Sequence, residues 1–183
     1  MNKLISEEEK YTGKRFKIIQ RAYERGDGLN YIRDCVEPGN SVIILPINDK
    51  NEVILEEQFR EAINKLTLEL PAGMIDAGEL PEVAAKRELE EETGILANNI
   101  EFLMEYYPSA GYTNEKVYIF VARDFQKGKV HLDQTEEIVS VKRIDFNKCF
   151  KMALNGEFEH ASINLAILMY YFKQKNGGED GRN

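Results

Sequence analysis

Residues 73–95 read GMIDAGELPEVAAKRELEEETGI, which is the most informative stretch of the chain. Pro81 suits the first turn of a helix, where its missing N–H is no loss, and Gly94 suits a left-handed stop after the last turn. Between them lie mainly alanine, leucine, lysine, arginine and glutamate, which favour helix. The sequence therefore predicts a helix that begins near Pro81 and ends before Gly94.

Four glutamates, at position 88 and at positions 90–92, fall within five residues of this helix. At about 100° per residue, Glu88, Glu91 and Glu92 share an arc of roughly 100°. Basic side chains at 86 and 87 are spaced to pair with positions 90 and 91, but none is spaced to pair with Glu88 or Glu92. Their mutual repulsion and the helix dipole each cost a few tenths to about 1 kcal/mol. One interpretation is a solvated acidic face; the other is a set of carboxylates that holds a divalent cation.

The stretch resembles the Nudix box, G-x5-E-x7-R-E-U-x-E-E-x-G-U, in which U is an aliphatic residue. All fixed positions are filled, by Gly73, Glu79, Arg87, Glu88, Leu89, Glu91, Glu92, Gly94 and Ile95. The resemblance implies a loop–helix–loop that binds Mg²⁺ or Mn²⁺ and hydrolyses nucleoside diphosphates linked to another group. The residue types agree with this chemistry, because Mg²⁺ takes carboxylate oxygens and bridges substrate phosphates.

The rest of the chain alternates short strands with helices. Strands are expected at residues 16–22, 29–36, 41–47, 52–59, 66–70, 100–107, 116–123 and 138–144, and further helices at 146–155 and 162–174. This order predicts an α/β protein with a mixed sheet and helices on its faces. It resembles the Nudix α/β/α sandwich, preceded by a small N-terminal β element.

Three segments are expected along the chain. Residues 1–40 form an N-terminal β hairpin that serves as a dimerisation element, and residues 41–175 form the Nudix hydrolase domain. Residues 176–183, rich in glycine and charge, form a disordered tail.

Composition favours a cytoplasmic enzyme with a small-molecule substrate. The net charge is −8 and no block of Lys or Arg stands out, which argues against nucleic-acid binding. No run approaches the roughly 18 apolar residues that span a membrane, and the N-terminus lacks the apolar core of a signal peptide. The two cysteines are isolated, as expected of reduced cytosolic thiols.

Segments outside the box resemble ADP-ribose pyrophosphatases, namely QFR at 58–60 and LELPAG at 68–73. Residues 33–40 also resemble a segment that GDP-mannose hydrolases share. In one departure, the loop after the box reads Ser-Ala-Gly at 109–111, where ADP-ribose hydrolases usually carry Ser-Pro-Gly. ADP-ribose is the expected substrate, and GDP-mannose, another nucleotide sugar or a dinucleotide is the alternative. A non-catalytic sensor of nucleotide sugars is the alternative from another class, but the complete set of acids favours an enzyme.

The resemblance also implies roles for the acids. Metal ions are expected on the Ala72 carbonyl and on Glu88, Glu91 and Glu92, of which Glu91 and Glu92 are also catalytic. Glu136, in a polar loop before a strand, is expected to orient or deprotonate the attacking water. Glu79 and Arg87 are expected to brace the loop–helix–loop.

Further residues are candidates for binding the substrate. Arg60 and Arg33 are either solvated strand residues or bidentate clamps for phosphate. Tyr23 and Tyr31 either stack on a base or pack within the hairpin. Because an isolated hairpin is marginally stable, its apolar residues are expected to pack on another surface. The resemblance to ADP-ribose pyrophosphatases implies that this surface is a homodimer interface, where the hairpin completes the partner's site, and a two-fold dimer is also the commonest closed assembly. His160 is expected to be a surface or capping residue without a catalytic role.

Overall fold

The computed structural model describes residues 2–132 and 138–177, which fall into two compact units. The first unit is Met1–Ser41 with Glu105–Val117, and the second is Val42–Met104 with Tyr118–Asn183. The predicted catalytic residue Glu136 and all but the first two residues of the predicted tail lie outside the described residues.

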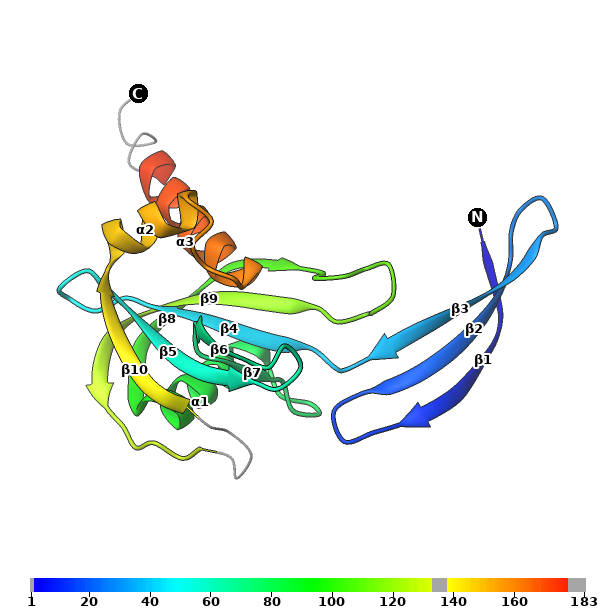
Figure 1. Ribbon diagram of the computed structural model, residues 1–183, viewed down its shortest axis with the longest axis horizontal. Helices are drawn as coiled ribbons and strands as arrows, with labels where there is room; N and C mark the ends of the chain where they lie inside the picture. Colours follow the sequence, from blue (N-terminus) through cyan, green and yellow to red (C-terminus); the bar gives the residue numbers. More distant parts are fainter. Residues whose placement is uncertain (1, 133–137, 178–183) are drawn as a thin grey trace. The chain divides into compact units, whose positions relative to one another are not determined.

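The first unit contains an antiparallel sheet of three strands in the order β1-β2-β3 (Figure 1). These are β1 (Lys3–Thr12), β2 (Lys17–Glu24) and β3 (Asn30–Glu37). Strands β2 and β3 are the predicted hairpin, whereas β1 is not among the predicted strands. Its sequence, KLISEEEKYT, lacks the apolar alternation that marks a half-buried strand, and the strand is exposed over its whole length.

Charged side chains join the three strands of this sheet. The Arg21 guanidinium on β2 donates to Glu7 of β1 at 2.5 Å and to Glu37 of β3 at 2.6 Å. The loop that precedes β9 is attached to β3 through the backbone, because the Val36 N–H donates to the Tyr112 carbonyl at 2.7 Å. The first unit therefore combines an N-terminal sheet with a loop from the middle of the chain.

Two sheets form the second unit. One has four strands in the order β7-β4-β9-β8 and the other three in the order β10-β5-β6. The first consists of β7 (Ala72–Met74), β4 (Ser41–Pro46), β9 (Val117–Lys127) and β8 (Ile95–Tyr106). The second consists of β10 (Ile138–Asp145), β5 (Glu52–Arg60) and β6 (Lys65–Glu69).

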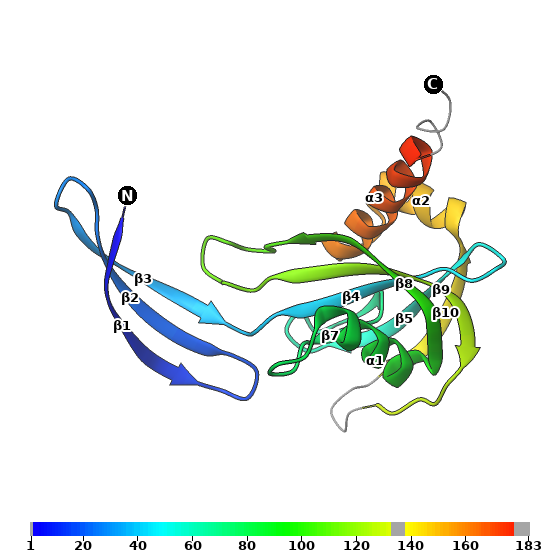
Figure 2. The ribbon, with the colours of Figure 1, turned by 180° about the vertical axis from the view of Figure 1, so that it is seen from behind.

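Helices cover this unit on two sides (Figures 1 and 2). On one side lies α1 (Pro81–Thr93), which ends at Gly94 with a left-handed φ of 68°. On the other lie α2 (Phe146–Leu154) and α3 (Ala161–Gly177). The predicted α/β architecture, with helices on two sides of the sheets and a small N-terminal β element, is observed. Among the described helices, none combines the length and apolar character that crossing a bilayer requires.

Helix α1 is held by its apolar face. Ala84, Ala85 and Leu89 are fully buried against residues of β4 and β9. The small alanines let the helix approach the sheet closely, and the acidic residues therefore occupy fixed positions beside β7. This packing positions the candidate site.

Candidate active site

Arg87 lies at the centre of the acidic cluster. Its guanidinium donates to both carboxylate oxygens of Glu79, at 3.0 and 2.9 Å, and to the Met74 carbonyl at 3.0 Å. It also donates to Glu88 at 2.7 Å and to Glu91 at 3.0 Å. Hydrogen bonding to Glu79 raises the pKa of Arg87 above its ordinary value, and the same bond lowers the pKa of Glu79. These contacts tie the loop before α1 to the helix, as expected of a brace.

One pairing expectation is met and extended by these contacts, and another is corrected. Arg87 pairs with Glu91, as its spacing predicts, and it also binds the adjacent Glu88. Lys86 pairs with Glu82, one turn earlier, at 2.8 Å. Glu90 lies instead beside the Gly128–Lys129 backbone, where it accepts a hydrogen bond from the Lys129 N–H at 3.3 Å.

Glu88 and Glu92 are buried against strand β7. They are only 7 % and 3 % exposed, whereas the Glu91 side chain is 35 % exposed. A Glu92 oxygen accepts a hydrogen bond from the Ala72 N–H at 2.9 Å. A Cβ at Gly73 would lie 2.0 Å from the carboxylate carbon of Glu88, so the absence of a side chain there makes room for this carboxylate. The structure therefore brings together the predicted residues Ala72, Glu88 and Glu92.

The oxygen donors of this cluster fit a hard divalent cation. Carboxylate and carbonyl oxygens are the ligands that Mg²⁺ and similar ions prefer. Two buried carboxylates are held here, that of Glu88 against Gly73 and that of Glu92 by the Ala72 N–H. In the arrangement described, Arg87 lies against Glu88 and Glu91. Within residues 2–132 and 138–177, no three Asp, Glu, His or Cys side chains are already grouped as a metal site.

A second charged network lies on the β5–β6 pair. The Arg60 guanidinium donates to both oxygens of Glu69, at 2.8 and 2.6 Å, and Thr67 donates to Glu69 at 2.5 Å. His160 Nε2 lies 3.3 Å from a Glu69 oxygen. The hydrogen bonds to Glu69 raise the pKa of Arg60, and the charges of Glu56 and Glu92 act in the same direction. Arg60 therefore lies within electrostatic range of the acidic helix.

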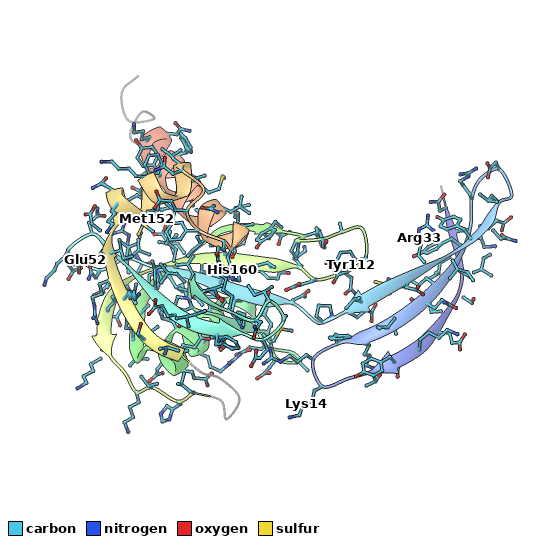
Figure 3. The ribbon with its side chains drawn as sticks, in the orientation of Figure 1. Lys14, Arg33, Glu52, Tyr112, Met152 and His160 are labelled. Atoms are coloured by element: carbon cyan, nitrogen blue, oxygen red, sulfur yellow. The ribbon has the colours of Figure 1, made fainter. Side chains whose placement is uncertain are left out.

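Sequence reasoning missed the contact between His160 and Glu69. The side chain of His160, labelled in Figure 3, is one-third exposed and belongs to the segment between α2 and α3. Its partner lies on β6, more than ninety positions earlier in the chain. No local pattern connects two positions so distant in sequence.

The remaining predicted residues lie in the first unit. Tyr23 and Tyr31 are cross-strand neighbours on β2 and β3, and their rings stack with centroids 5.5 Å apart. The Arg33 guanidinium lies 4.8 Å from the Tyr31 ring centroid. With Tyr112 and its neighbours, these side chains line a hollow of about 490 Å³ (Figure 3 labels Arg33 and Tyr112). The same hollow is lined by Ala110, the residue that departs from the Ser-Pro-Gly pattern.

Comparison with known proteins identifies the family. The family model described as the NUDIX domain matches residues 37–164, and the chain therefore belongs to the NUDIX family. It is 30 % identical over 174 residues to an ADP-ribose pyrophosphatase of Bacillus subtilis (strain 168), which covers 94 % of each chain. It is also 31 % identical to a GDP-mannose pyrophosphatase of Enterobacter sp. (strain 638) over 80 % of this chain and 81 % of the relative.

Two further proteins are similar to this chain. A methanol dehydrogenase activator of Bacillus methanolicus is 33 % identical over 125 residues, 68 % of each chain. A solved ADP compounds hydrolase superimposes with a TM-score of 0.86 over 97 % of this chain and 96 % of that one. Its sequence identity is 24 %, so it supports the fold alone. The predictions of a Nudix enzyme and of a resemblance to ADP-ribose pyrophosphatases are confirmed. Enzymes of this family generally use divalent metal ions.

Proposed function

We propose that the protein hydrolyses the diphosphate bond of a nucleoside diphosphate sugar, with ADP-ribose as the preferred substrate and AMP and ribose 5-phosphate as products. The observation that carries this proposal is the pair of buried carboxylates, Glu88 and Glu92, held against Ala72 and Gly73. The length of the match to the Bacillus subtilis ADP-ribose pyrophosphatase supports the choice of substrate.

Mg²⁺ or Mn²⁺ is the proposed cofactor, held by the Ala72 carbonyl and by Glu88, Glu91 and Glu92. When bound, such an ion neutralises charge on the diphosphate and activates water. Glu91 and Glu92 are the proposed catalytic carboxylates, together with Glu136, which lies outside the described residues. Arg87 and Glu79 keep the loop in register with the helix through their mutual hydrogen bonds.

Two sets of side chains are proposed to recognise the substrate. Arg60 supplies a guanidinium for the diphosphate, because its charge lies within range of Glu92 and a planar fork suits phosphate oxygens. Arg33, Tyr31 and Tyr23 line the hollow of the first unit and offer a cation and aromatic faces for the nucleoside. The enzyme is proposed to work in the cytoplasm.

Two alternatives have support of their own. The identity to the Enterobacter GDP-mannose pyrophosphatase, 31 %, is comparable to that of the ADP-ribose relative, so GDP-mannose is the competing substrate. The 33 % identity to a methanol dehydrogenase activator supports a regulatory role as the competing class. The intact set of acids favours an enzyme over a sensor that only binds.

A substrate panel tests the proposal. With Mg²⁺ or Mn²⁺ present, ADP-ribose is expected to show a higher kcat/KM than GDP-mannose, NADH and diadenosine polyphosphates, because QFR at 58–60 and LELPAG at 68–73 resemble the ADP-ribose enzymes. Products are identified by chromatography as AMP and ribose 5-phosphate. A preference for GDP-mannose would change the substrate but retain the mechanism, whereas binding without turnover of any compound would favour the sensor.

The N-terminal sheet is proposed to form a homodimer that completes the partner's site. Apolar side chains exposed on this sheet and its turns support it, namely Leu4, Ile5, Tyr11, Phe16, Leu29 and Ile32. Light scattering is expected to give about twice the monomer mass of 21.1 kDa. Deleting residues 1–36 is expected to abolish dimerisation and weaken substrate binding together. A monomer with full activity would exclude this role.

A further inference from the structure

Glu69 is a buried carboxylate that must remain compensated. It is 5 % exposed and accepts hydrogen bonds from Arg60 and Thr67. Burial acts to raise the pKa of Glu69, but the hydrogen bonds from Arg60 and Thr67 hold it below its ordinary value. Glu69 is therefore a negative charge at neutral pH, and removing a cationic partner from such a group is costly.

Two anions compete for the guanidinium of Arg60. In the structure, its Nε and Nη2 atoms are both directed to Glu69. In the proposed function, the same guanidinium binds the substrate diphosphate. If the Arg60 guanidinium moved from the Glu69 carboxylate to a phosphate, the hydrogen bond from the Thr67 hydroxyl would remain on Glu69. Another cation would then be needed to replace Arg60.

His160 is placed to be that cation. Its Nε2 atom already lies 3.3 Å from Glu69, and its side chain is 32 % exposed, so a proton can reach it from solvent. The segment that carries it is attached to β6 by a second pair, since Lys65 binds the adjacent Glu159. Its carbonyl accepts a hydrogen bond from the Asn164 side chain at 3.4 Å, at the start of α3.

We propose that His160 is a positioning residue that takes over the Glu69 carboxylate when the Arg60 guanidinium moves to the substrate diphosphate, so that substrate binding takes up a proton. The inference rests on the proposed function, because it needs a diphosphate as the second partner of Arg60. It assigns His160 no contact with the substrate.

The charges that face His160 determine the sign of the effect. Glu69 on β6 is a negative charge with an oxygen 3.3 Å from His160 Nε2, and Arg60 on β5 is a positive charge paired with the same carboxylate. Lys65 and the adjacent Glu159 form an ion pair that carries no net charge. When Arg60 leaves, the favourable charge of Glu69 remains and the opposing charge moves away. His160 then binds a proton more readily, and by linkage the substrate binds more tightly at low pH.

Calorimetry with a non-hydrolysable ligand tests this coupling. The probe is α,β-methylene ADP-ribose with Mg²⁺, titrated in two buffers of different protonation enthalpy. Its diphosphate is a diester and has no group that titrates near neutral pH. Wild-type protein is expected to take up a substantial fraction of one proton, and Kd is expected to weaken about tenfold between about pH 6 and pH 8.

Three variants identify the group that takes up the proton. In H160Q, proton uptake and the pH dependence of Kd are expected to be lost, and KM is expected to rise at low pH with little change in kcat. In H160K, whose charge is permanent over this range, Kd is expected to stay low up to pH 8 without proton uptake. H131Q replaces the other histidine of the chain. The described contact of His131 is made by its backbone N–H, which the substitution keeps, so this variant is expected to behave as wild type.

The outcomes separate the two proposals. Tight binding with equal proton uptake in wild type and H160Q would overturn the role of His160 and leave the proposed function standing. Binding that takes up no proton in wild type would do the same, because the inference requires His160 to gain a proton when the substrate binds. Failure of the wild type and of every variant to bind the probe would overturn ADP-ribose as the proposed substrate and this inference with it.

Discussion

Replacing Glu92 with glutamine is expected to lower kcat by more than about 100-fold. Loss of a residue that only supports a metal ligand costs roughly 10- to 100-fold, and Glu92 is proposed to bind the metal directly. The change keeps the size of the side chain and removes a charge from a group that is only 3 % exposed. The amide oxygen can still accept the hydrogen bond from the Ala72 N–H. The fold should therefore survive, because repulsion within α1 is relieved.

The Glu92→Gln experiment compares kcat at saturating Mg²⁺ with the thermal unfolding midpoint of the same protein. An inactive enzyme with an unchanged or raised Tm is the expected result. Glu82→Gln is the matched control, because it removes an exposed carboxylate from the same helix. The described side-chain contact of Glu82 is its ion pair with Lys86. Normal turnover of Glu92→Gln at saturating Mg²⁺ would show that the metal role is wrongly assigned.

Replacing Gly73 with alanine is expected to reduce activity strongly with a much smaller effect on stability. The new Cβ would lie 2.0–2.4 Å from the carboxylate atoms of Glu88, closer than nonbonded atoms can approach. The clash is with the end of a flexible side chain and not with backbone, so Glu88 can swing away and the fold can adapt. The carboxylate would then lie outside the position from which it serves the site.

A double-mutant cycle separates this effect from general damage to the loop. If Gly73→Ala acts by displacing Glu88, adding it to Glu88→Gln should cost little further activity, because the affected group has already been removed. Activities are measured with each variant at saturating metal, together with Tm. Additive losses in the double variant would indicate that alanine harms the loop itself and not the placement of Glu88.

The sequence predicts regular elements well where their ends carry chemical signals. Helix α1 begins at Pro81 and is capped by Gly94, as expected from the restrictions of proline and the left-handed φ of glycine. Strand β1 was missed because all ten of its residues are exposed and many are charged, so it carries no period-two pattern. Strand β8 begins at Ile95, five residues before its predicted start at residue 100.

The site could be predicted only where its residues are neighbours in sequence. Glu88, Glu91 and Glu92 follow from one helix, and Arg87 follows from the same motif. The contacts of Glu69 do not, because Arg60 lies nine positions away on the paired strand and His160 on another part of the fold. Such contacts depend on which residues the paired strands and the segment before α3 bring together in space, and no local sequence pattern identifies those partners.

The attachment of β1 has a consequence for how the protein responds to ionic strength. Within one protomer this strand buries no apolar residue. Besides its backbone pairing with β2, it is joined to that strand by Arg21–Glu7 and Lys17–Glu9 pairs that are partly or largely exposed. Exposed ion pairs weaken as salt shortens the Debye length, from about 30 Å at 0.01 M to about 8 Å at physiological salt, whereas apolar contacts do not. The outer edge of the first sheet is thus its salt-sensitive part, and the core around α1 is insulated from the same change.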